Sequence, residues 1–236
     1  MAMINYAHRG CSELYPENTL YSFYMGLSMK ADGIETDIQR TSDGVLVLFH
    51  DDDLKRILGK DGRICDYTYS ELLQFDFGAY KGPEFQQETI VTLEEFCRHF
   101  GKKDLTFALE IKQQGIEKDA LDIVNAYKMR DKVIFTSFMW DSLLNIRKMD
   151  AEIRIGFLTD KVTDATFTDL LRYNIQQICP HIDHFTEEQF TKARNFGLSI
   201  RYWGISSEEK MLKAIRMEPD GMTVNNPSML TNALGR

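Results

Sequence analysis

Two short segments of this 236-residue chain carry charged side chains two positions apart: Glu35 and Asp37 in the first, Glu110 and Lys112 in the second. Side chains at positions i and i+2 of a β-strand share one face, so each pair points the same way if these segments are strands. Three converging carboxylates without partners repel one another and lose solvation, and a bound divalent cation relieves both costs. Carboxylate oxygens suit hard ions, so Glu35, Asp37 and Glu110 predict one site for Mg²⁺ or Ca²⁺.

A second interpretation of these carboxylates is purely structural. They would then pair with Arg9 or Lys112 and hold no ion, which is the more common role for an acidic pair on an arbitrary strand. Two histidines and two cationic side chains are expected at the same end of the fold, however, and that combination favours the metal site.

His8 and His50 each follow a β-rich run and stand next to a charged residue. An unperturbed imidazole titrates at about pH 6.5, so two of them in one cavity can act as an acid and a base. Arg9 and Lys112 supply positive charge for a phosphate group or its transition state. The set indicates phosphate-ester chemistry rather than hydride or acyl transfer, and the chain contains no G-x-S-x-G or nucleotide-binding loop.

The elements that would position these residues alternate between β-rich runs and helical patterns. Eight parallel-type strands plus one hairpin strand predict an α/β fold, a (β/α)₈ TIM barrel with its active site at the carboxyl ends of the strands. A doubly wound sheet is the weaker alternative, because no G-x-G-x-x-G follows the first strand. The expected strands span residues 3–8, 33–39, 45–49, 105–111, 133–137, 153–157, 175–179, 198–202 and 221–224, and the expected helices 18–30, 93–100, 117–129, 140–149, 164–173, 186–196 and 207–217.

Residues from about 51 to 91 interrupt this alternation with many glycines and aromatic residues. We interpret this stretch as a small insertion subdomain after the hairpin, within a single domain that spans residues 1–236. Asn18 is expected to cap the first helix and Thr92 the helix after the insertion. Four aromatic side chains of the insertion would either hold a lipid tail or pack it onto the barrel: Tyr67, Phe75, Phe77 and Phe85.

The composition is that of an ordinary globular protein, with 43% hydrophobic and 27% charged residues. The net charge of −8 argues against nucleic-acid binding, and no apolar run is long enough for a membrane span. Four scattered cysteines predict neither a zinc cluster nor a disulfide framework. Without a recognisable signal peptide the default location is the cytoplasm, or the periplasm or exterior if a leader was removed. The sequence does not define an oligomeric state.

An ordered set of motifs resembles the glycerophosphodiester phosphodiesterase family from the first strand to the last. The matching segments are His8-Arg9-Gly10, Pro16-Glu17-Asn18-Thr19, Gly33-Ile34-Glu35-Thr36-Asp37-Ile38, Ser42-Asp43-Gly44, Phe49-His50-Asp51, Asp66-Tyr67-Thr68, Thr92-Leu93-Glu94-Glu95, Leu109-Glu110-Ile111-Lys112, Ser137-Phe138 and Asp220-Gly221. Three segments depart from the family pattern and affect the expected contacts to the alcohol: Trp203-Gly204 instead of Trp-Thr, Val224-Asn225-Asn226-Pro227 instead of a Thr-Asp before the proline, and Arg56-Ile57-Leu58 where threonines are usual.

The resemblance implies metal-dependent hydrolysis of glycerophosphodiesters to glycerol 3-phosphate and an alcohol. It assigns His8 and His50 as the acid/base pair and the three carboxylates as metal ligands. Arg9 and Lys112 would hold the phosphate, and Trp203 would contact the substrate. The alternatives are a related barrel phosphodiesterase acting on lysophospholipids or sphingolipids, and a non-catalytic phosphoglycerol-binding module. A small molecule is the expected partner in each case.

Overall fold

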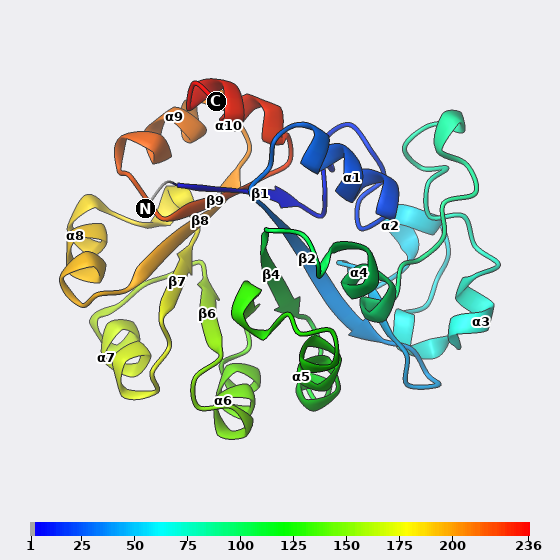
Figure 1. Ribbon diagram of the computed structural model, residues 1–236, viewed down its shortest axis with the longest axis horizontal. Helices are drawn as coiled ribbons and strands as arrows, with labels where there is room; N and C mark the ends of the chain where they lie inside the picture. Colours follow the sequence, from blue (N-terminus) through cyan, green and yellow to red (C-terminus); the bar gives the residue numbers. More distant parts are fainter. Residues whose placement is uncertain (1–2) are drawn as a thin grey trace.

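The computed structural model describes residues 3–236 and contains a closed barrel of eight parallel strands (Figure 1). The strands follow one another in the order β1-β9-β8-β7-β6-β5-β4-β2, and pairing of β1 with β2 closes the ring. A short strand, β3, runs antiparallel to the end of β2. The predicted (β/α)₈ TIM barrel is therefore confirmed. The strands are β1 (Ile4–His8), β2 (Gly33–Arg40), β3 (Leu46–Leu48), β4 (Thr106–Ile111), β5 (Val133–Ser137), β6 (Arg154–Thr159), β7 (Gln177–Pro180), β8 (Ser199–Ile205) and β9 (Gly221–Val224).

Helices cover the outside of this barrel (Figure 1). They are α1 (Leu20–Ser28), α4 (Leu93–Phe100), α5 (Glu117–Ala126), α6 (Trp140–Met149), α7 (Asp164–Arg172), α8 (Glu187–Asn195), α9 (Glu208–Arg216) and the short α10 (Pro227–Ala233). Two 3₁₀ turns, η3 (Arg130–Lys132) and η4 (Ile182–His184), lie in the connections.

Hydroxyl side chains begin most of these helices by accepting a backbone N–H of the first turn. Thr92 caps α4 in this way, as predicted. The prediction that Asn18 caps the first helix is wrong, because Thr19 accepts the N–H of Ser22 and begins α1. Asn18 instead adopts a left-handed conformation, with φ 58°, and turns its amide toward the barrel. Asparagine tolerates this conformation better than most residues, so its presence before a helix does not distinguish a cap from a turn.

The strand alternation sends aliphatic side chains outward and charged ones inward. Ile34, Ile38 and Leu109 are buried in one large hydrophobic cluster with the inner faces of the helices. Each such side chain contributes about 1.5–3 kcal/mol by leaving water. Glu35 and Asp37, on the opposite face of β2, are therefore directed into the barrel, as the spacing predicted.

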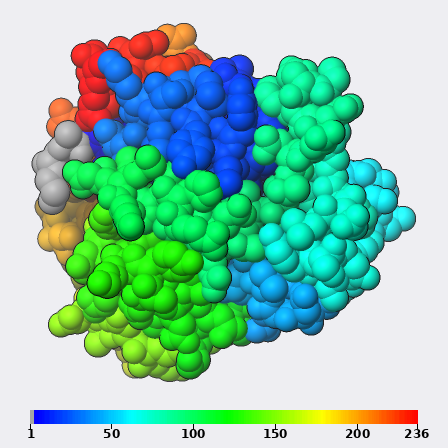
Figure 2. Space-filling view, turned by 45° about the vertical axis from the view of Figure 1, so that its right-hand side comes forward, coloured from blue at the N-terminus to red at the C-terminus, as the bar shows by residue number. Residues whose placement is uncertain are grey.

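Residues 51–91 form a lobe beside the barrel, coloured cyan to blue-green on the right of Figure 2. The lobe has its own hydrophobic cluster, to which β3 and the residue after it contribute Val47 and Phe49. Phe77 is buried in this cluster, and Tyr67 and Phe75 pack against it, so these aromatic residues anchor the lobe. Its short elements are α2 (Lys55–Leu58), η1 (Ile64–Asp66), α3 (Tyr69–Leu72) and η2 (Pro83–Phe85).

Among residues 3–236, no helix has both the length and the apolar composition needed to cross a bilayer.

Candidate active site

A cavity of about 340 Å³ opens at the carboxyl ends of the barrel strands. The predicted residues His8, Arg9, Glu35, His50, Glu110 and Trp203 line it directly. Asp37 and Lys112 each lie next to Glu110, which is one of the lining residues. The structure therefore brings all eight predicted site residues together. A groove of about 590 Å³ beside the β2–β3 hairpin is larger, but it contains neither histidine and none of the three carboxylates.

The three carboxylates come from two neighbouring strands. Glu35 and Asp37 lie on β2, Glu110 lies on β4, and the register places Asp37 beside Glu110. One oxygen of each lies within 4.8 Å of the others. Glu35 Oε2 and Asp37 Oδ1 are buried without a hydrogen-bond partner among the described residues. Two such unpartnered oxygens in a group of buried carboxylates fit a hard divalent cation, which binds several oxygen ligands.

The pKa values of these carboxyl groups reflect their burial and their closeness to one another. Burial, followed by the charge of Asp37, raises the pKa of Glu35 well above its usual value. The same two causes raise the pKa of Glu110 to about 7. Burial alone would raise the pKa of Asp37, but the surrounding positive charges, that of Arg9 foremost, together outweigh it and lower that pKa to about 2. A bound cation would favour the ionised form of all three groups.

Cationic side chains balance part of this negative charge. Arg9 Nε lies 3.2 Å from Asp37 Oδ2, and Lys112 Nζ lies 3.2 Å from Glu110 Oε1. The pairs expected from the structural interpretation are thus present, yet they leave Glu35 Oε2 and Asp37 Oδ1 free. Pairing and metal binding are therefore compatible in this site.

The turn that carries Arg9 has an unusual backbone. Arg9 itself is left-handed, with φ 55°, a conformation that costs a non-glycine residue about 1–3 kcal/mol. At the next position, Gly10, a Cβ atom would lie 2.6 Å from the carbonyl oxygen of Ser22 in α1. Only glycine allows this close approach, and the tight turn directs Arg9 back toward Asp37.

His8 lies at the end of β1, and its two ring nitrogens face different groups of the site. Its Nδ1 is 2.5 Å from Asn225 Oδ1, and its Nε2 is 3.7 Å from Glu35 Oε2. An amide oxygen only accepts hydrogen bonds, so Nδ1 carries the proton and the Nε2 lone pair faces the carboxylates. Burial, reinforced by the Arg9 charge, lowers the pKa of His8 to about 3, which keeps the ring neutral.

His50 follows β3 and has a different environment. Its Nδ1 lies 2.7 Å from Asp51 Oδ1, so Asp51 accepts this proton and Nε2 is free to serve the cavity. A carboxylate in this position fixes the tautomer and the orientation of the ring. The two histidines therefore differ in their partners: an amide oxygen of Asn225 holds His8, and the carboxylate of Asp51 holds His50.

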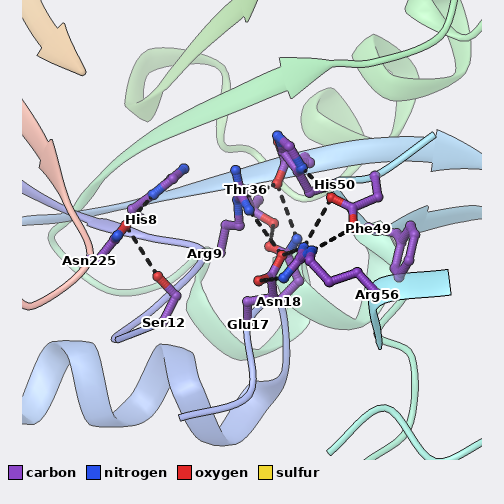
Figure 3. A network of polar contacts seen from close by, with 12 residues as sticks. His8, Arg9, Ser12, Glu17, Asn18, Thr36, Phe49, His50, Arg56 and Asn225 are labelled. Atoms are coloured by element: carbon purple, nitrogen blue, oxygen red, sulfur yellow. Dashed lines mark hydrogen bonds and ion pairs between the residues drawn. The ribbon is translucent and has the colours of Figure 1, made fainter. Parts of the chain in front are cut away.

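A chain of polar contacts continues from these groups into the surrounding loops (Figure 3). Asn18 Nδ2 donates to Asp37 Oδ2 over 3.1 Å, and Asn18 Oδ1 accepts from Thr36 Oγ1 over 2.7 Å. Glu17 Oε1 accepts from Arg9 Nη1 over 3.0 Å. Asn18 thus orients Asp37, a proposed metal ligand, and Glu17 orients Arg9, a proposed phosphate-binding residue. The sequence analysis assigned neither role.

Arg201 is a second residue that the sequence analysis missed. It is only 1% exposed, lines the cavity and has neutral hydrogen-bond partners, among them Gln177 Oε1 at 3.3 Å. It stands two positions before Trp203 on β8, so the spacing rule that found the carboxylates also places Arg201 on the inner face. With Arg9 and Lys112 it gives three cations against three carboxylates.

Trp203 forms an aromatic wall of the cavity with Phe138. The two rings meet edge to face at 5.3 Å between centroids, and Trp203 Nε1 donates to the carbonyl oxygen of Cys179 over 3.0 Å. These contacts fix the indole ring. None of the four aromatic residues of the 51–91 lobe considered for a lipid tail lines this cavity.

Comparisons with known proteins identify the family to which this chain belongs. The sequence model of the "Glycerophosphoryl diester phosphodiesterase family" matches residues 8–229. A glycerophosphodiester phosphodiesterase of Caldanaerobacter subterraneus subsp. tengcongensis is 32% identical over 231 residues, covering 96% of this chain and 95% of that protein. Among solved structures, an Oleispira antarctica phosphodiesterase in complex with the product sn-glycerol-3-phosphate superposes with a TM-score of 0.92 at 28% identity, covering 100% of this chain and 98% of that one. A glycerophosphodiester phosphodiesterase of Thermotoga maritima has a TM-score of 0.79 at 28% identity, covering 100% and 99%. The chain therefore belongs to the glycerophosphoryl diester phosphodiesterase family and is an enzyme of this class.

Proposed function

We propose that this protein hydrolyses glycerophosphodiesters to glycerol 3-phosphate and an alcohol with the help of one divalent cation, Mg²⁺ or Ca²⁺. The observation that carries the proposal is a group of three buried carboxylates beside two histidines at one cavity of about 340 Å³. Glu35, Asp37 and Glu110 would hold the ion. When bound, it would polarise the phosphodiester and neutralise charge that develops on its oxygens.

The charge balance supports an anionic ligand. Arg9, Lys112 and Arg201 offset the three carboxylates, so a divalent cation leaves the cavity with an excess of positive charge. A phosphodiester carries a single negative charge and would be attracted to it. Arg9 and Lys112 would hold its phosphate oxygens, and Trp203 would pack against the carbon atoms of the substrate.

The two histidines would divide the proton transfers. His8, neutral with its Nε2 lone pair directed into the site, would take the proton from the nucleophile as the new P–O bond forms. His50, supported by Asp51, would give a proton to the alcohol oxygen as the old P–O bond breaks. The nucleophile is either water or the neighbouring glycerol hydroxyl, and the second choice requires a later attack of water on a cyclic phosphate.

One assay tests the function and its alternatives. Release of glycerol 3-phosphate is measured from glycerophosphocholine and glycerophosphoethanolamine, in EDTA and after restoring Mg²⁺ or Ca²⁺. Turnover that needs the ion supports the proposal. Faster release of choline from lysophosphatidylcholine, which leaves an acylated glycerol phosphate, would favour the lysophospholipid alternative. Ligand binding without turnover under any ion would favour a binding module.

A further inference from the structure

Arg56 connects residues on the two sides of the proposed catalytic site (Figure 3), although it is not one of the residues that line the cavity. On one side, its Nε and Nη2 donate to Asp51 over 2.6 and 3.0 Å. On the other, its Nη1 and Nη2 donate to Glu17 over 2.7 and 2.7 Å. Asp51 in turn accepts from His50 Nδ1, and Glu17 accepts from Arg9. One guanidinium therefore connects the partner of a histidine with the partner of the phosphate-binding arginine.

We propose that Arg56 is a positioning residue that fixes His50 and Arg9 relative to each other by clamping Asp51 to Glu17. The inference rests on the proposed function, because it gives His50 and Arg9 their roles. Arg56 belongs to α2 of the 51–91 lobe, whereas Glu17 belongs to the loop between β1 and α1. The clamp thus makes the lobe part of the catalytic geometry.

The shape of the guanidinium is what this arrangement requires. Its planar fork makes paired hydrogen bonds to two carboxylates at once, which an ammonium group does not reproduce. Asp51 and Glu17 have little freedom left, since each also bonds a group of the site. A displacement of about 1 Å at the reacting groups is enough to lower turnover by about 10²-fold.

The ion pairs of Arg56 contribute little to the stability of the fold. The Arg56 side chain is 46% exposed, and ion pairs with an exposed member contribute little to stability because water screens them. The lobe is also attached to the same loop independently, because Lys81 Nζ donates to the carbonyl oxygen of Ser12 over 2.7 Å. Removing Arg56 should therefore leave the lobe docked and change mainly the orientation of Asp51 and Glu17.

The experiment compares Arg56→Met and Arg56→Lys with a matched control. Arg130 makes a similar paired contact with Asp150, at 2.8 and 2.8 Å, far from the cavity, so Arg130→Met removes an equivalent ion pair. We measure kcat and KM for glycerophosphocholine in the ion that supports turnover, together with the melting temperature of each variant. Long-range ¹H–¹⁵N spectra report which ring nitrogen of His50 carries the proton. The Asp51→Asn variant provides the reference spectrum of a His50 that has lost its carboxylate partner.

We expect Arg56→Met to lower kcat/KM by about 10–100-fold, the range found for residues that orient active-site ligands. Arg56→Lys should recover little of this loss, Arg130→Met should leave kcat/KM within twofold of wild type, and all three proteins should melt at similar temperatures. The His50 spectrum of Arg56→Met should move toward that of Asp51→Asn. Glu17→Gln should lower kcat/KM by a smaller factor in the Arg56→Met background than in the wild-type protein, because both residues act through the same clamp.

The inference is overturned if Arg56→Met loses no more activity than Arg130→Met, if Arg56→Lys is fully active, or if the His50 spectrum is unchanged. A wild-type protein that turns over none of these diesters would refute the proposed function instead. The His50 spectrum and the melting temperatures would then still decide whether Arg56 positions the histidine, because neither measurement requires turnover.

Discussion

Replacing Glu110 by glutamine gives a quantitative test of the carboxylate site. In the metal-free protein, burial and the charge of Asp37 raise the pKa of Glu110 from 4.5 to about 7. The folded protein thus binds this proton more tightly than the unfolded chain, which stabilises the fold at low pH. The stabilisation is complete below pH 4.5 and is lost as the pH rises through 7. The loss amounts to about 3 kcal/mol, because one pKa unit corresponds to about 1.4 kcal/mol.

His8 opposes this trend and must be separated from it. Its pKa is lowered from 6.5 to about 3 in the folded protein, so His8 favours folding increasingly as the pH rises across that range. His8 is present in both proteins, so its contribution cancels to first order when the free energy of unfolding of Glu110→Gln is compared with that of wild type. We expect the free energy of unfolding of the variant, relative to wild type, to rise by about 3 kcal/mol between pH 4.5 and 8 in EDTA.

Thermal and urea unfolding at several pH values, in EDTA and with Mg²⁺ or Ca²⁺, provide the assay. A change of 3 kcal/mol corresponds to roughly 6–12 °C in melting temperature for a chain of this size. An ion at 100 times its Kd should stabilise wild type by about 2.7 kcal/mol and Glu110→Gln much less. Glu117, a buried glutamate outside the cavity, supplies the control variant Glu117→Gln. A pH-independent difference, or an equal response of Glu110→Gln and wild type to the ion, would refute the electrostatic reasoning.

Three further outcomes are expected. His8→Ala and His50→Ala should each lower kcat by about 10²–10⁴-fold while the melting temperature is retained; near-wild-type turnover in both would contradict the assignment. Asn18→Ala should cost about 2–3 kcal/mol in urea unfolding, because a hydrogen bond to a buried carboxylate is lost; a cost under about 0.5 kcal/mol would show that this bond contributes little. Trp203→Ala should raise KM for small diesters more than it lowers kcat, since the proposed contact of this ring with substrate would be present in every state of the reaction; an unchanged KM would exclude this contact.

The parts of the site that follow strand periodicity could be predicted from sequence. Glu35, Asp37 and Glu110 alternate with aliphatic residues and Thr36, and that pattern defines both the strand and the face. The closed barrel followed from the same alternation repeated along the chain. Arg201 obeys the rule as well, so it could have been found by applying the rule to β8.

The loop contacts could not be predicted because loops have no periodic sequence pattern. Asn18 could be a helix cap or a left-handed turn residue, and only the presence of Thr19 at the cap position in the structure decides between them. Arg56 and Glu17 are 39 residues apart, and His8 and Asn225 are 217 residues apart. Nothing local in the sequence encodes such pairs, since they form only when separate loops meet at one end of the barrel.

The pairing of β1 with β9 has a consequence for protein synthesis. The hydrogen bond that fixes the His8 ring needs Asn225, which leaves the ribosome 217 residues later. At about 5–20 residues per second this interval is roughly 10–40 s. During that time β1 has neither its β9 neighbour nor the residue that orients its histidine. A nascent chain would therefore assemble the carboxylate group from β2 and β4 well before His8 adopts its working orientation, so premature termination products should be inactive even where they fold in part.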